Sequence, residues 1–131
     1  MSDIGPAAGA TVLVCITCRA LTDSLDAPRA GATLAEATAL AAANAAEVSV
    51  QRVRCLGNCN RGLSAAIRCK NTWTYVFGGL DPACDGPNLI AGALLLSQSS
   101  DGLLPWRERP EPLKRGLIAR VPPLQFREEA P

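Results

Sequence analysis

The 131-residue sequence contains no histidine, and this absence removes several kinds of site at once. A Rieske-type cluster and a Cys/His zinc finger both need imidazole ligands, so both are excluded. The sequence also lacks a glycine-rich phosphate loop and a nucleophile elbow. Without these motifs or a histidine base, we do not expect an enzyme that acts alone on a substrate.

Long hydrophobic runs are absent as well. The run LIAGALLL at residues 89–96 is far shorter than the roughly 20 apolar residues that a membrane span needs. The N-terminus has no basic region followed by the apolar core of a signal peptide. The net charge of +1 provides no bulk attraction to nucleic acid or to a membrane. These features predict a cytoplasmic globular protein with neither nucleic acid nor membrane as a partner.

Acidic residues are missing from residues 48–80, although this segment carries basic ones. The basic residues there are Arg52, Arg54, Arg61, Arg68 and Lys70. The middle of the chain is therefore locally cationic, and it contains a pair of cysteines.

Six cysteines are present, and four of them form two closely spaced pairs. The first pair is CITC, Cys15 and Cys18, and the second is CLGNC, Cys55 and Cys59. The cytoplasm keeps thiols reduced, so cysteines there are metal ligands or redox groups more often than structural disulfides.

The pattern of apolar residues predicts an α/β fold. Continuous apolar residues predict a buried strand at 10–15, and Thr33 with Glu36 forms a capping box for a helix over 33–46. A second strand is expected over 48–55, an antiparallel hairpin over 64–70 and 72–80, and a helix that begins near Pro87. This βαβ unit followed by ββα resembles the thioredoxin-like fold.

The segment 103–131 holds six of the ten prolines and six of the thirteen basic residues. Proline interrupts regular structure, so this segment is not expected to be one helix or strand. We predict a thioredoxin-like domain over residues 1–102 and an extended, Pro/Arg-rich C-terminal arm over 103–131. The arm either wraps over the domain or reaches to a partner.

Both cysteine pairs follow the ends of predicted parallel strands, so they should meet at one edge of the sheet. Four thiolates on loops with Gly57 and Asn58 nearby favour a [2Fe–2S] cluster bound by Cys15, Cys18, Cys55 and Cys59. A structural zinc site would use the same four residues. A thiol–disulfide oxidoreductase would use only Cys15 and Cys18. Buried structural thiols are the remaining alternative.

The two other cysteines are not expected to be ligands. Cys69 lies inside a predicted strand, where a small buried thiol is common. Cys84 lies in a loop and is an alternative to Cys18 as the fourth ligand.

The segment CLGNC is similar to the C-L-G-x-C segment of thioredoxin-like [2Fe–2S] ferredoxins, and the order of elements agrees over about residues 10–100. The resemblance implies a one-electron carrier in which Cys15, Cys55 and Cys59 are ligands. Cys18 departs from the family, whose first pair is more widely spaced. The family also implies redox partner proteins and a homodimer.

Nearly the whole chain resembles a bacterial family of small predicted metal-binding proteins often encoded near cobalamin-biosynthesis functions. The resemblance includes the CITC and CLGNCNRG segments, the strand TWTYVFGGL and the tail PWRERPEPLKRGLIARVPPL. It implies a ferredoxin that serves a step of cobalamin metabolism.

Overall fold

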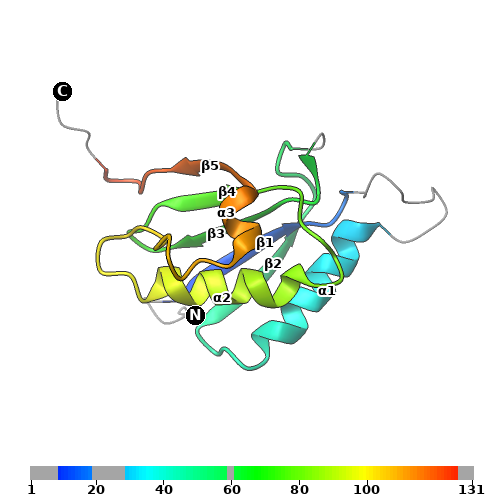
Figure 1. Ribbon diagram of the computed structural model, residues 1–131, viewed down its shortest axis with the longest axis horizontal. Coiled ribbons are helices and arrows are strands. Elements are labelled where there is room, and N and C mark those ends of the chain that lie inside the picture. The colour runs from blue at the N-terminus through cyan, green and yellow to red at the C-terminus, as the bar shows by residue number, and fades with distance from the viewer. Residues whose placement is uncertain (1–8, 19–28, 59–60, 127–131) are drawn as a thin grey trace.

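The computed structural model describes residues 9–18, 29–58 and 61–126 of the chain (Figure 1). Five strands and three helices are found in these residues. In chain order they are β1 (Ala10–Cys15), α1 (Ala30–Ala42), β2 (Val48–Val53), β3 (Ala65–Cys69), β4 (Thr74–Phe77), α2 (Asp85–Ser97), α3 (Glu111–Arg115) and β5 (Leu117–Val121). None of the helices in the described part of the chain is long and apolar enough to cross a membrane.

The strands form one sheet in the order β2-β1-β3-β4-β5. β1 and β2 are parallel, and their register places Cys15 opposite Val53. β3 is antiparallel to β1 and to β4. The predicted βαβ unit and the following hairpin are therefore confirmed. Because β1 and β2 run in the same direction, the loops that follow them leave the same edge of the sheet.

The first helix begins three residues earlier than the capping box predicts. Ala30 is its first residue, and the N-cap residue Arg29 makes no side-chain capping hydrogen bond. Thr33 thus lies inside the helix, and the prediction of a Thr33 cap is wrong. The start is fixed by packing instead, because the Gly31 N–H donates to the Cys18 carbonyl at 3.0 Å. A Cβ at Gly31 would lie 2.2 Å from the Cys15 carbonyl oxygen, so only glycine fits there.

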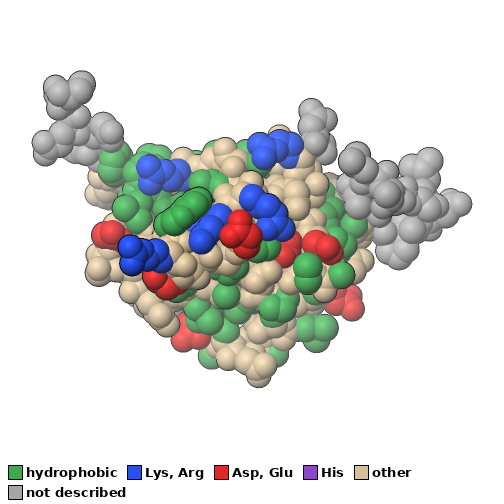
Figure 2. Space-filling model, in the orientation of Figure 1, with side chains coloured by type: hydrophobic (Ala, Val, Ile, Leu, Met, Phe, Trp, Pro, Cys, Tyr) green, Lys and Arg blue, Asp and Glu red, His purple; other side chains and the backbone are tan. Residues whose placement is uncertain are grey.

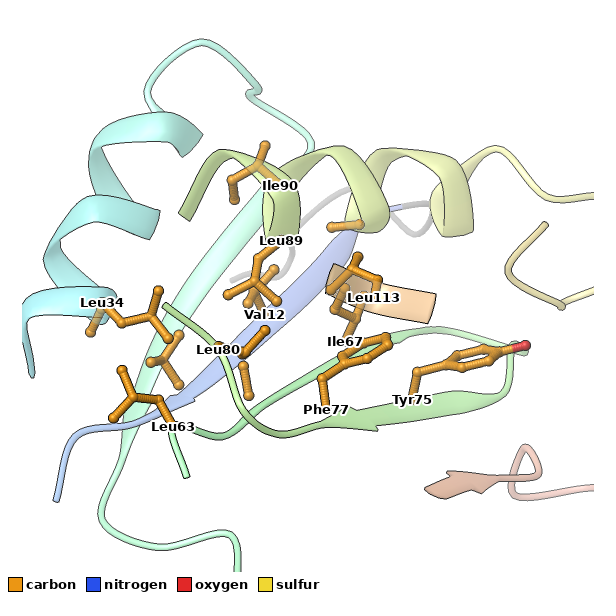
Figure 3. Close-up of a cluster of buried hydrophobic side chains, with 14 of the residues drawn as sticks. Val12, Leu34, Leu63, Ile67, Tyr75, Phe77, Leu80, Leu89, Ile90 and Leu113 are labelled. Atoms are coloured by element: carbon orange, nitrogen blue, oxygen red, sulfur yellow. The ribbon is translucent and has the colours of Figure 1, made fainter. Parts of the chain in front are cut away.

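The core lies between the sheet and a layer formed by the helices. α1 and α2 lie side by side and both contact β1 (Figure 1). Figure 3 shows Leu89 of α2 against Val12 of β1, and Leu34 of α1 pointing toward Leu63. All four side chains are fully buried. Burial of this apolar surface, at about 25 cal/mol per Å², is the main term that stabilises the fold.

The C-terminal segment wraps over the domain, but it is not simply extended. α3 and β5 lie within it, and β5 pairs antiparallel with β4 as an edge strand. Leu104 and Leu113 are buried in the common core. Pro112 occupies the first turn of α3, where its missing N–H breaks no helical hydrogen bond. The prolines therefore separate two short elements and do not prevent them.

Candidate functional site

The first cysteine pair is buried and compact. Cys15 ends β1, and Cys18 follows in the loop that leads toward α1. The two side chains are 1% and 6% exposed, and their sulfur atoms are 3.1 Å apart. Both are free thiols, not a disulfide. The loop is held by the core on one side and by Gly31 on the other, so the two sulfurs are fixed close together by packing.

The second cysteine loop is more open. Cys55 is exposed, and the Gly57 N–H donates to its sulfur at 3.1 Å. Gly57 has a φ of 73°, in the left-handed region that glycine adopts without strain. The unusual backbone angle that glycine allows is thus present at Gly57, whereas Cys59 lies outside the described residues.

The two loops touch through the backbone around Cys55. The sulfur of Cys15 lies 3.5 Å from the Arg54 carbonyl oxygen, and the Leu56 N–H also hydrogen-bonds to it. The Thr17 hydroxyl donates to the same Arg54 carbonyl. Residues on both sides of Cys55 therefore contact the first pair. The backbone register of β1 with β2 therefore brings these loops together.

A hydrogen-bond network centred on Ser64 links the two cysteine loops. The Ser64 carbonyl accepts from the Cys15 N–H at 3.0 Å, and the Ser64 hydroxyl and N–H bond to the Cys18 thiol. The side-chain amide of Asn58 donates to the Ser64 hydroxyl at 2.9 Å. Ser64 is fully buried, so these bonds satisfy a polar group that would otherwise be costly. The sequence analysis did not single out Ser64. The one signal for it is a polar residue directly before a buried strand.

The surroundings shift the pKa values of the two thiols of the first pair in opposite directions. Burial raises the pKa of the Cys15 thiol, but hydrogen bonds with Cys18, Thr17 and Leu56 together outweigh this effect and lower it. For Cys18, burial, the hydrogen bond to Cys15 and the charge of Cys15 raise the pKa to about 11. The first proton of the pair therefore leaves Cys15 more readily than Cys18, and a bound metal cation would take the place of both protons.

The other two cysteines lie apart from this edge. Cys69 ends β3 at the opposite edge of the sheet, and its sulfur lies 3.2 Å from the Gly9 carbonyl. Cys84 caps α2, where desolvation and the carboxylates of Asp85 and Asp81 raise its pKa.

A cavity of about 520 Å³ lies at the Cys69 end of the sheet, away from the paired cysteines. Arg68, Lys70 and Phe126 are among its lining residues. Its position separates it from the loops that follow β1 and β2, so it does not belong to the cysteine site.

The structure brings Cys15 and Cys18 into contact and places Cys55 on the adjoining loop. Among residues 9–18, 29–58 and 61–126, no three metal-binding side chains are grouped closely enough to hold a metal ion. Cys84 is therefore not gathered with the first pair. The chemistry of these residues suits a metal group bound by thiolates, because free thiols and backbone N–H donors to sulfur occur together. The set of four ligands stays a prediction.

Comparison with protein families gives one match over most of the chain. The model of the family described as "Protein of unknown function (DUF1636)" matches residues 12–123. The search among curated proteins gives no match.

Two solved structures are similar in fold. One is a thioredoxin-like [2Fe–2S] ferredoxin from Aquifex aeolicus, with a TM-score of 0.55 and 18% identity over 90% of this chain and 98% of the ferredoxin chain. The other is the wild-type thioredoxin-like [2Fe–2S] ferredoxin from Aquifex aeolicus, with a TM-score of 0.54 and 14% identity over 85% and 97% of the two chains. At this identity the likeness shows the fold, so the thioredoxin-like prediction is confirmed.

Proposed function

The chain belongs to the DUF1636 family, and we propose that it is a one-electron carrier with a single [2Fe–2S] cluster held by Cys15, Cys18, Cys55 and Cys59. The observation that carries the proposal is the parallel pairing of β1 with β2. It places the CITC loop and the CLGNC loop at one edge of the sheet, in direct contact. Two cysteine pairs on adjoining loops suit a cluster that takes four thiolates.

The backbone around the sulfurs also suits an anionic group. The Gly57 N–H donates to the Cys55 sulfur, and the Leu56 N–H bonds to the Cys15 sulfur. Such donors stabilise negative charge on sulfur and raise a reduction potential. When bound, the cluster would supply reversible one-electron oxidation and reduction of iron. The residues of the chain would hold it, exclude water on the Cys18 side and leave the Cys55 side open.

The exposed Cys55 loop gives a redox partner protein a close approach, while the buried first pair anchors the site in the core. The proposed role is that of a carrier and not of an enzyme, in the cytoplasm. A homodimer, and an acceptor in cobalamin metabolism, belong to the same proposal.

A second function is favoured by one distance. The 3.1 Å separation of the Cys15 and Cys18 sulfurs, with unequal pKa values, also suits a dithiol that closes to a disulfide. The two functions differ at the second loop. Cys55 is essential for a cluster and dispensable for a dithiol.

The first experiment is an absorption spectrum from about 300 to 700 nm of protein purified without oxygen, with iron and zinc counted on the same sample. A red-brown protein with two irons per chain, bleached by dithionite, supports the proposal. A colourless protein with stoichiometric zinc would contradict it and indicate a structural zinc site instead.

Cysteine variants then test the ligands. Cys55→Ser should remove or strongly alter the visible absorption, whereas the control Cys69→Ser, at the other end of the sheet, should keep it. A normal spectrum in Cys55→Ser would show that the ligand assignment is wrong. Unchanged disulfide reductase activity in that variant would favour the dithiol.

A further inference from the structure

A small hollow lies beside the CLGNC loop, where three backbone segments meet. Its volume is about 180 Å³, and it is lined by Arg61, Gly78, Gly79, Pro112, Arg115 and Gly116. Arg61 follows the second cysteine pair, and Arg115 ends α3. Two residues far apart in sequence thus place guanidinium groups around one hollow. Arg61 is two positions after Cys59 in the chain.

Close backbone packing builds this hollow. The Gly79 N–H donates to the Arg61 carbonyl at 2.7 Å, and the Gly78 N–H donates to the Gly116 carbonyl at 2.8 Å. A Cβ on Gly78 would lie 2.5 Å from the Arg61 carbonyl oxygen, and one on Gly116 would lie 2.7 Å from the Gly78 carbonyl oxygen. Glycine at both positions allows the cysteine loop, the end of β4 and the start of β5 to meet. The backbone positions of the two arginines are therefore fixed by the fold.

Neither arginine side chain forms an ion pair with any residue in the described part of the chain. Both are exposed, and the lining of the hollow contains no carboxylate. Lys and Arg side chains are spread over the surrounding face, above α3, β5 and the loop after β2, with an acidic side chain among them (Figure 2). Unpaired guanidinium groups on one hollow attract carboxylates, to which they donate paired hydrogen bonds.

We propose that the hollow between Arg61 and Arg115 is the docking point for a carboxylate from an acidic surface of the redox partner. This inference rests on the proposed function, because it places the partner over the cysteine edge. The occupant is an acidic protein and not nucleic acid, for two reasons. The hollow admits a side chain but carries no aromatic ring on which a base could stack, and the net charge of the chain is only +1.

The test is binding of fluorescein-labelled hexaglutamate to the purified protein at low salt, measured by fluorescence anisotropy. Each of Arg61→Glu and Arg115→Glu should weaken binding by about fivefold or more, since a favourable contact becomes a repulsive one. The control Arg68→Glu makes the same change of charge at the other end of the sheet. It should weaken binding by less than about twofold.

Equal losses in all three variants would overturn the proposal, because they would report net charge alone. Tighter binding of a labelled single-stranded oligonucleotide, lost in the same two variants, would overturn it in favour of nucleic acid.

A kinetic measurement ties the hollow to electron transfer. Reduced protein is oxidised by ferricyanide, an anion, and separately by hexaamminecobalt(III), a cation. Arg61→Glu and Arg115→Glu should slow the first reaction and speed the second, each by about threefold or more, while Arg68→Glu changes both less. No selective effect would mean that electrons leave elsewhere. The visible spectrum decides the proposed function separately, so a protein with a cluster and no selective effect would refute only the docking point.

Discussion

The two cysteine loops leave the same edge of the sheet, but they are built in opposite ways. The CITC loop has both cysteines buried, is held against α1 and has its two sulfurs in contact. The CLGNC loop carries an exposed Cys55 and depends on the left-handed conformation of Gly57. The first loop is shaped by packing from outside, and the second by its own backbone. A site of this kind can be rigid where it meets the core and accessible where a partner approaches.

The contrast predicts different responses to the same change from glycine to alanine. In the first loop, Gly31→Ala puts a methyl group 2.2 Å from the Cys15 carbonyl oxygen. Because the obstacle is backbone, α1 or the loop must move. We expect a loss of about 3 kcal/mol in the free energy of unfolding, measured by urea denaturation.

The next helical position provides the matched control for Gly31→Ala. Ala32→Gly should cost only about 1 kcal/mol, through backbone entropy. If Gly31→Ala were no more harmful than this control, the close contact between α1 and the first loop would not be what fixes the site.

The rate of thiol alkylation should also differ between the two loops, and this is a smaller effect. In reduced protein stripped of metal, iodoacetamide at pH 8 should modify Cys55 at least about tenfold faster than Cys18, because Cys18 is buried and its pKa is about 11. The rates are read by mass spectrometry of peptides. In strong denaturant the difference should vanish. Similar rates in the folded protein would show that the first loop opens freely.

The smallest expected effect is in the second loop. Gly57→Ala meets no atom within 4 Å, so it costs only the strain of a positive φ, about 1 kcal/mol. Asn is a gentler substitution, because it tolerates this conformation better. Gly57→Asn should therefore unfold closer to the wild type than Gly57→Ala. The reverse order would mean that the loop relaxes away from its left-handed turn.

Much of this architecture could be predicted from the sequence, because periodicity and composition are local signals. The apolar run at residues 10–15 and the β-branched run from Val48 predict β1 and β2, and their connection implies parallel pairing. That pairing was enough to predict that Cys15 and Cys55 share an edge.

Other features depend on contacts between distant segments, which no local pattern reports. The start of α1 is set by Gly31 against Cys15, so the Thr33 capping box gave the wrong boundary. Ser64 and Arg115 join the site only because β3 and α3 pack beside the cysteine loops. β5 was missed because prolines surround it, and its partner β4 stabilises it in the folded chain.

The central position of β1 has a consequence for how the protein is made. β1 lies between β2 and β3, and its Cys15 N–H is bonded to the Ser64 carbonyl. Contacts this remote in sequence form slowly during folding. The Cys15 loop cannot reach its folded position on the ribosome until residue 64 has left the exit tunnel and β3 has joined β1. Any group that both loops bind would therefore be taken up late in the life of the nascent chain, after the middle of the sheet has assembled.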